Sequence, residues 1–228
     1  MIRMPDASEF AVISDVHLGS RYFLRDRFGP FVEQLPAGVT LVLNGDTIDR
    51  PKRRLSAEDK VVLDMLISQS LVRRIVWVYG NHDKDCRLER TGNIEFVHHF
   101  EIGKRLFIAH GHDFDNIMPR NRIFIILFRA MHHSRILFGA QSMHVAFYAK
   151  KWAFLYKILR DHVRRNAVEY ATENGFSCVA CGHTHYVEDI TEGGIRYINT
   201  GSWTEDSPHW IHVTHKSVNL RAVKQMAL

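Results

Sequence analysis

Five short polar clusters in the sequence combine aspartate, asparagine and histidine, and each follows an apolar run. Carboxylate oxygen, amide oxygen and neutral imidazole are the groups that divalent metal ions bind in proteins. In Asp15-x-His17 and in His183-x-His185 the paired side chains are two residues apart, so in an extended segment both can reach one ion. Asp46 has two carboxylate oxygens with which to bridge two ions. The clusters are Asp15-Val16-His17, Asn44-Gly45-Asp46, Gly80-Asn81-His82-Asp83, His110-Gly111-His112 and Gly182-His183-Thr184-His185.

The apolar runs before the clusters predict the elements that position them. Residues 10–13, 39–43 and 75–79 are rich in β-branched and aromatic side chains, which is typical of buried strands. Between the last two runs, a capping box and apolar residues at helical spacing predict a helix over 56–71. Strand, helix, strand at this spacing indicates parallel strands. Ligands of such sheets bind beyond the carboxyl ends of the strands, where we expect the clusters to meet.

The rest of the chain has a less regular pattern. Residues 21–35 indicate a helix that is interrupted at Gly29-Pro30, because proline lacks the N–H that a helix interior needs. Cys178 and Cys181 lie three residues apart, so on a strand they face opposite sides, and we expect core packing rather than a redox or zinc site. The other predicted elements are short strands over 94–97 and 105–110, two or three helices over 117–166, a strand over 176–180, a hairpin over 186–199 that turns at Gly193-Gly194, and a last strand near 211–213.

Composition limits the class of protein. The 228 residues are 46% hydrophobic, which fits one large domain and excludes general disorder. Three cysteines are too few for a disulfide scaffold and indicate a reducing compartment. No secretory signal is found, and the longest uncharged apolar stretches are shorter than the ~18 residues of a membrane span. We therefore expect a cytoplasmic protein that is able to bind peripherally to the inner face of the membrane.

Positive charge is concentrated in residues 117–166, which hold ten basic residues and one acidic residue, Asp161. Large apolar residues are interleaved with the basic ones, which a merely solvated helical face does not need. The segment therefore predicts an anionic partner, namely a phosphate, a nucleic acid or a lipid headgroup. The run Ile123–Phe128 is apolar on all sides, so acyl chains or protein are favoured over nucleic acid as its cover.

The series DxH, GDxxD, GNHD, HG and GHTH, over residues 15–185, resembles the calcineurin-like metallophosphoesterases. The resemblance implies an α/β fold, a four-layer αββα sandwich, with a site for two divalent metal ions. Mn²⁺ is the expected metal, and Fe, Zn²⁺ or Co²⁺ also suit the ligands. It implies hydrolysis of a phosphodiester or diphosphate by a hydroxide that bridges the two ions. By the motif positions, one ion would be held by Asp15, His17, Asp46 and His185, and the other by Asp46, Asn81, His110 and His183.

The same resemblance assigns catalytic roles to two further residues. His82 of GNHD would be the catalytic imidazole near the leaving-group oxygen, and Asp49 of GDTID would orient it. His112 follows His110 by two residues and could compete for the metal, although the family pattern favours His110. Histidines without a motif are expected at the surface or in a lid; they include His98, His99, His132, His133, His144 and His162.

A narrower resemblance concerns the substrate. The inserted segment between the HG and GHTH motifs, the run HGHDFD and the run YINTGSW are similar to the UDP-2,3-diacylglucosamine pyrophosphatases. This resemblance implies a single domain, 1–228, in which a helical insertion, 115–170, forms a lid over the acyl chains of a nucleotide-diphosphate lipid. Residues 117–166 would contact the membrane. These pyrophosphatases typically carry arginine in place of His82. Another lipid-linked or nucleotide diphosphate is therefore as strongly expected to be the substrate as UDP-2,3-diacylglucosamine. The basic residues expected to bind the substrate are Arg120, Arg122, Arg129, Lys150 and Lys151.

Three other functions fit parts of the same pattern. A nuclease or nucleotide phosphodiesterase of the same superfamily would use the basic segment to follow a phosphate backbone. A non-catalytic scaffold would not need the seven candidate ligands together with His82 and Asp49, all of which are present. A lipid-surface binding module would need the helices of the insertion but not the site.

Overall fold

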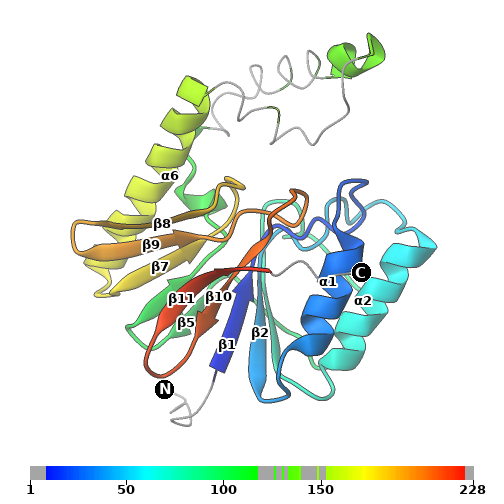
Figure 1. The fold of residues 1–228 in the computed structure, drawn as a ribbon, viewed down its shortest axis with the longest axis horizontal. Coiled ribbons are helices and arrows are strands. Elements are labelled where there is room, and N and C mark those ends of the chain that lie inside the picture. The colour runs from blue at the N-terminus through cyan, green and yellow to red at the C-terminus, as the bar shows by residue number, and fades with distance from the viewer. Residues whose placement is uncertain are drawn as a thin grey trace.

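Two mixed β-sheets form the centre of the protein (Figure 1). The computed structural model describes residues 9–117, 126, 130, 133–139, 148 and 153–223. The strands are β1 (Glu9–Ile13), β2 (Val39–Asn44), β3 (Ile75–Val78), β4 (Glu95–Val97), β5 (Phe100–Ile102), β6 (Leu106–Ile108), β7 (Cys178–Cys181), β8 (Glu188–Glu192), β9 (Ile195–Asn199), β10 (His209–Val213) and β11 (Val218–Ala222). The six-stranded sheet has the order β11-β10-β1-β2-β3-β4, and the five-stranded sheet has the order β5-β6-β7-β9-β8.

The strands that precede the polar clusters are parallel within each sheet. In the six-stranded sheet β1, β2, β3 and β4 are parallel, and β10 is antiparallel to β1. In the five-stranded sheet β6, β7 and β9 are parallel, and the edge strands β5 and β8 are antiparallel to their neighbours. The helices are α1 (Arg25–Gln34), α2 (Ala57–Gln69), the 3₁₀ turn η1 (His112–Phe114) and α6 (Ala153–Glu173).

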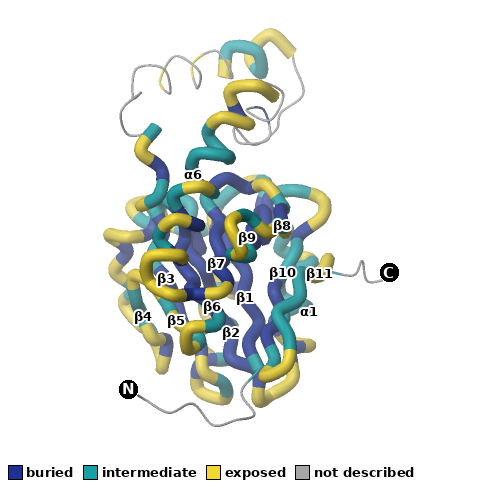
Figure 2. Tube along the Cα trace, turned by 90° about the vertical axis from the view of Figure 1, so that its left-hand side faces the viewer, coloured by how far each residue is buried: buried dark blue, intermediate teal, exposed yellow. Residues whose placement is uncertain are grey.

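Buried side chains divide the molecule into four layers. Along β1, alternation directs Ala11 and Ile13 toward α1 and α2, and Phe10 and Val12 toward the other sheet. Residues of α6 pack on the outer face of the five-stranded sheet. The order is therefore helix, sheet, sheet, helix, as the resemblance implied. Figure 2 shows the buried strands at the centre of the sandwich, with exposed residues mainly in the loops and outer helices.

Most of the predicted elements are confirmed. The strands before the clusters, the helix between β2 and β3 and the hairpin of β8 and β9 all form. The side chain of Ser56 caps α2 by accepting a hydrogen bond from Asp59 N at 3.1 Å. Cys178 faces the space between the sheets and Cys181 faces α6, so both pack in the core as expected.

Three predictions about elements were wrong. The helix expected to break at Gly29-Pro30 is continuous through α1. Phe28 and Val32 are fully buried on either side of the proline, so their packing outweighs the loss of one helical hydrogen bond. The strand near 211–213 is followed by β11, and β5 was not predicted. Because β5 has three residues and β11 is only partly buried, neither has the apolar pattern of a core strand.

Helix α6 is partly a core helix and partly exposed. Its C-terminal half buries Ala167, Val168 and Ala171 against the five-stranded sheet. Its N-terminal end, where Phe154 is exposed, projects beyond the edge of the sheets (Figure 1). The lid predicted over 115–170 stays a prediction, and the five basic residues expected to bind the substrate lie outside the described residues. None of the described helices is long and apolar enough to cross a membrane.

Asp83 ties the loop after β2 to the loop after β3. Its buried carboxylate accepts hydrogen bonds from Thr47 N at 2.7 Å, Gly80 N at 2.7 Å and Trp77 Nε1 at 3.1 Å. Burial raises the pKa of Asp83, and the N–H donors act in the opposite direction. Because a buried N–H group without a hydrogen bond costs free energy, these three bonds fix the GDTID and GNHD loops relative to each other.

Candidate metal centre

The five clusters meet at one edge of the sheets, where β1, β2, β3, β6 and β7 end (top of Figure 1). Backbone hydrogen bonds join their loops. Asp15 N donates to Gly45 O at 3.1 Å, and Gly182 N donates to His110 O at 2.9 Å. The loops that carry the predicted ligands are therefore direct neighbours, although they are far apart in the sequence.

Asp15, His17 and His185 form one group of converging donor atoms. The Nε2 atoms of His17 and His185 are 3.1 Å apart. Asp15 Oδ1 is 3.8 Å from the first of these nitrogens and 3.2 Å from the second. All three side chains are buried. Two imidazole nitrogens and a carboxylate oxygen that converge in this way are a donor set for a divalent transition metal ion.

Asp46 lies between two groups of imidazoles. Its Oδ2 is 3.3 Å from His110 Nε2, 3.9 Å from His82 Nε2 and 4.0 Å from His17 Nε2. Its Oδ1 accepts a hydrogen bond from the backbone N–H of His82 at 2.7 Å. His110 Nε2 is buried and has no hydrogen-bond partner among the described residues. The carboxylate of Asp46 therefore faces imidazoles from three different loops.

Asn81 and His183 are in contact beside this group. His183 Nδ1 is 3.0 Å from Asn81 Oδ1, and His183 Nε2 is 2.9 Å from Asp115 Oδ2. Because an ionised carboxylate only accepts, Nε2 of a neutral His183 carries the proton, and the Nδ1 lone pair faces the amide oxygen. Both atoms are of the types that bind divalent cations in proteins.

Asp115 is a residue of the site that the sequence analysis missed. It is buried and holds His183 through the nitrogen opposite to the one that faces Asn81. Histidines that bind metals commonly donate their other N–H to a carboxylate in this way. The run HGHDFD contains Asp115, but its spacing from His183 gives no signal that the two side chains meet.

Asp49 contacts two histidines. His82 Nδ1 is 2.8 Å from the backbone oxygen of Asp49 and 3.4 Å from its Oδ1. His17 Nδ1 is 3.3 Å from the same Oδ1. The sequence analysis assigned Asp49 to His82 alone. In the structure its carbonyl holds His82, and its carboxylate lies between His82 and His17.

The carboxylates and imidazoles shift each other's pKa. Burial alone would raise the pKa of Asp15, but His185 and His110 lower it to about 2. Burial alone would lower the pKa of His110, but Asp46 and Asp15 raise it to about 10. Burial is likewise outweighed at His82, where Asp49 and Asp46 raise the pKa to about 9. Asp15 is therefore ionised at neutral pH, which is the form that binds cations, and a metal ion has to displace protons from the histidines.

His112 does not belong to the converging groups of donor atoms. Its Nε2 is 3.4 Å from Asp113 Oδ1, at the exposed side of η1. Burial, and then the charge of His110, lower the pKa of His112 to about 4. His110 rather than His112 lies within reach of Asp46 and Asp15.

Two glycines allow the backbone to approach the carboxylates closely. A Cβ atom on Gly80 would lie 2.2 Å from Asp46 Oδ1, and one on Gly182 would lie 2.2 Å from Asp15 Oδ2. Real Cβ atoms do not approach an oxygen this closely, so any side chain at either position would displace a carboxylate. The glycines of the GNHD and GHTH motifs are therefore part of the shape of the site.

The predicted ligands share an uncommon backbone conformation. Among the described non-glycine residues, φ is positive only at five of them, with values between 50° and 64°. This left-handed conformation costs a non-glycine residue roughly 1–2 kcal/mol. Such strain persists only where the surrounding structure imposes it, and it is concentrated at functional sites. The five residues are Asp15, His17, Asp46, His183 and His185.

The residues at this edge fit divalent cations. The donors are carboxylate, amide and imidazole, the atoms converge, and a buried nitrogen of His110 faces Asp46 without a hydrogen bond. A protein-family model described as calcineurin-like phosphoesterase matches residues 8–187, which include all five clusters. The chain belongs to the calcineurin-like phosphoesterase family. It is therefore a metal-dependent phosphoesterase, and the predicted enzyme class is confirmed.

Several solved structures are similar to this phosphoesterase. They include a variant of Vps29 from Entamoeba histolytica (17% identity, TM-score 0.47, covering 94% of this chain and 98% of that one), the phosphoesterase Yfce from E. coli (15%, 0.47, 95% and 100%) and an archaeal phosphodiesterase (17%, 0.47, 94% and 98%). No curated protein matches the chain in sequence. The family assignment rests on the family model.

The left-handed backbone at His183 predicts an unusual order of stability. In metal-free protein, His183→Gly should be more stable than His183→Ala by roughly 0.5–1 kcal/mol, because only alanine carries the penalty of a positive φ. Urea unfolding of the two variants measures the difference. At Lys60, an exposed residue of α2, the order should reverse, since glycine in a helix costs about 1 kcal/mol relative to alanine. The same order at both positions would contradict strain at His183.

Proposed function

We propose that this phosphoesterase holds two divalent metal ions, with Mn²⁺ as the first candidate, and hydrolyses a phosphodiester or diphosphate at them. The observation that carries the proposal is the position of Asp46, whose one carboxylate faces both His17 and His110. One ion would be held by Asp15, His17, Asp46 and His185, and the other by Asp46, Asn81, His110 and His183.

Two bound cations would polarise the phosphoryl group and lower the pKa of water. The chain's own residues would do the rest. His82, which is partly exposed, would donate its Nε2 proton to the leaving-group oxygen. Asp49 would keep the ring in place, because its backbone carbonyl lies 2.8 Å from Nδ1 of His82 and would accept a hydrogen bond from the Nδ1–H.

Substitutions of Asp46 and His82 should have different effects on metal binding and on activity. Asp46→Ala should lose both Mn²⁺ binding and activity, because one carboxylate serves both ions. His82→Ala should bind Mn²⁺ as the parent does, while kcat falls roughly 10²–10⁴-fold, the usual range for the loss of a general acid. Equilibrium dialysis measures the bound Mn²⁺, and hydrolysis of a diester with a poor leaving group measures kcat.

Asp113→Ala is the matched control, because Asp113 is an exposed carboxylate close to the site. It should change neither metal binding nor kcat. If His82→Ala matches the parent on the substrate with the poor leaving group, the acid role of His82 is wrong.

We further propose that the substrate is a nucleotide-diphosphate lipid, UDP-2,3-diacylglucosamine or a relative. Large apolar side chains are exposed in the inserted segment: Leu137 (86%), Phe138 (91%) and Phe154 (75%). Exposed apolar groups of this size need acyl chains, a membrane surface or protein to cover them. They support a lid over acyl chains in a cytoplasmic enzyme that contacts the membrane through residues 117–166.

The basic residues of α6 do not favour a nuclease. Lys157 Nζ is 2.7 Å from Asp161 Oδ2. Arg164 is 2.9 Å from both Glu188 and Glu192, which belong to β8. Part of the positive charge that stands out in the sequence is therefore balanced within the fold. A protein that follows a nucleic-acid backbone needs basic residues directed at phosphates instead.

The exposed apolar side chain of Phe154 should matter for a lipid substrate specifically. Phe154→Ser should lower the ratio of kcat/KM for UDP-2,3-diacylglucosamine in mixed micelles to that for bis(p-nitrophenyl) phosphate about tenfold, because burial of such a side chain contributes roughly 1.5–3 kcal/mol. Val61→Ser, at a residue of α2 with 68% exposure, should leave the ratio unchanged. A ratio that is the same in both variants would contradict the lipid proposal.

A further inference from the structure

A small cavity opens beside His82, next to the loop that follows Asp49. Its volume is about 210 Å³, and its lining is Arg50, Pro51, Lys52, His82 and Asp85. Among the described residues, His82 is the one that belongs both to this lining and to a group of converging metal-ligand atoms. A group that occupies the cavity therefore touches the imidazole of His82, which in the proposed function faces the leaving-group oxygen.

The lining attracts anions. Arg50 and Lys52 are exposed cations, and Asp85 is the one acidic side chain of the lining. Arg50 Nε is 3.3 Å from Asp49 Oδ2, and a guanidinium group has further N–H donors for a second acceptor. Arg53 and Arg54 follow directly in the sequence but lie outside the lining. None of these residues is among the predicted metal ligands.

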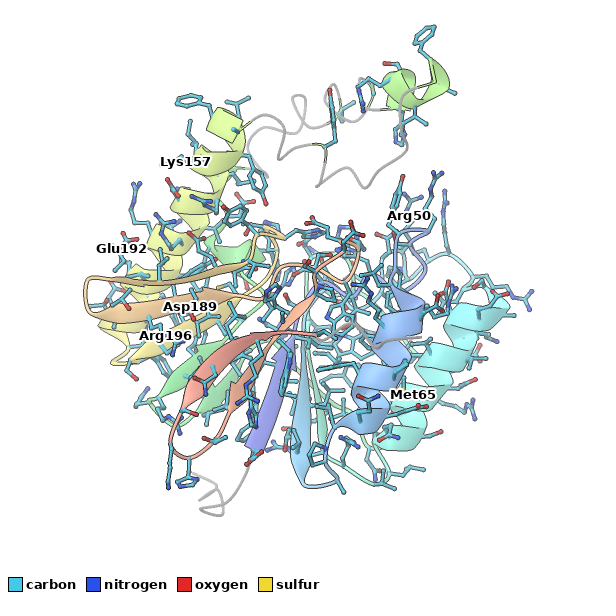
Figure 3. All side chains as sticks on the ribbon, viewed as in Figure 1. Arg50, Met65, Lys157, Asp189, Glu192 and Arg196 are labelled. Carbon is cyan, nitrogen blue, oxygen red and sulfur yellow. The ribbon has the colours of Figure 1, made fainter. Side chains whose placement is uncertain are left out.

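A tight turn fixes the backbone of Arg50 and Lys52. Arg53 N donates a hydrogen bond to Arg50 O at 2.9 Å, which closes a four-residue turn. Pro51 has the second position of this turn, where its fixed φ is favoured. Arg50 rises from the same edge of the sheets at which the metal-ligand loops meet (Figure 3). The loop therefore presents its charges beside the reacting atoms.

We propose that this cavity is the leaving-group pocket and that it selects substrates whose leaving group is itself a phosphate. The inference rests on the proposed function, in which His82 faces the leaving-group oxygen. When water attacks one phosphorus of a diphosphate, the bond from that phosphorus to the bridging oxygen breaks. The bridging oxygen keeps the electron pair, takes the Nε2 proton of His82 and leaves as part of the second phosphate. The attacking water loses a proton to the solvent, from which His82 is protonated again.

The charge of the departing group decides between substrates. A departing phosphate carries more negative charge than a departing alcohol or phenol does, and this charge increases as the bond breaks. Lys52 and Arg50 would stabilise it with charge-assisted hydrogen bonds. The cavity therefore favours diphosphates over simple diesters, whichever group is attached to the far phosphate.

The test compares two substrates that differ by one phosphate, p-nitrophenyl thymidine 5′-phosphate and p-nitrophenyl thymidine 5′-diphosphate. Both give thymidine 5′-monophosphate, which chromatography quantifies with the full-length protein in Mn²⁺. Lys52→Ala should lower the ratio of kcat/KM for the diphosphate to that for the monophosphate about tenfold, the size of a lost charge-assisted hydrogen bond. Lys52→Arg should restore the ratio. Asp85→Asn should raise it, because the opposing charge is removed.

Arg54→Ala is the matched control. It removes the same charge from the same loop but outside the lining, and it should leave the ratio unchanged. Phenyl phosphate, which represents the leaving group alone, should inhibit the parent competitively, with a Ki about tenfold higher in Lys52→Ala.

Three results would overturn the proposal. The first is an equal loss in Lys52→Ala and Arg54→Ala, which would show a general field effect. The second is an unchanged ratio in both Lys52→Ala and Asp85→Asn, and hydrolysis of both substrates would then leave the proposed function intact. The third is hydrolysis of neither substrate by the parent, which would overturn the proposed function and the pocket together.

Discussion

The close approach of electron-pair donors at the ends of the strands is the constraint on which the rest of the structure depends. Nitrogens of His17 and His185 lie 3.1 Å apart, and a nitrogen of His183 lies 3.0 Å from an oxygen of Asn81. Five residues of the same loops have a positive φ, which costs roughly 1–2 kcal/mol each. The sum approaches the whole net stability of a domain, about 5–15 kcal/mol. The free energy gained by burying the three apolar cores has to offset this cost. Strain of this kind is typical of functional sites.

The inserted segment and the metal centre are connected through α6. Near its exposed N-terminal end, the hydroxyl of Tyr156 donates a hydrogen bond to the carbonyl of Thr184, which lies between His183 and His185 in the chain. Further along, Arg164 pairs with Glu188 and Glu192 of β8. The helix that carries the exposed apolar side chains is thus attached directly to the GHTH loop. If the exposed end of α6 binds the substrate as proposed, these contacts would connect it to the GHTH loop.

Much of the fold could be predicted because its signals are local. A strand buried on both faces is a continuous apolar run, and each motif directly follows such a run. Contacts between side chains that are distant in the sequence have no such local pattern and could not be predicted. The pairing of Asp115 with His183, the double contact of Asp49 and the balance of charge between α6 and β8 depend on packing of the whole chain. The break predicted at Pro30 followed from the low helix propensity of proline. Burial of the neighbouring residues Phe28 and Val32, which that propensity does not include, keeps α1 continuous.

Electron paramagnetic resonance of the Mn²⁺-loaded protein tests the central claim most directly. Two ions that share the Asp46 carboxylate would lie about 3.5–4 Å apart, which is close enough for magnetic coupling. The account predicts the spectrum of a coupled pair once two equivalents of Mn²⁺ are bound. A spectrum of magnetically isolated Mn²⁺ at saturating metal would contradict a shared carboxylate and with it the paired-ion mechanism.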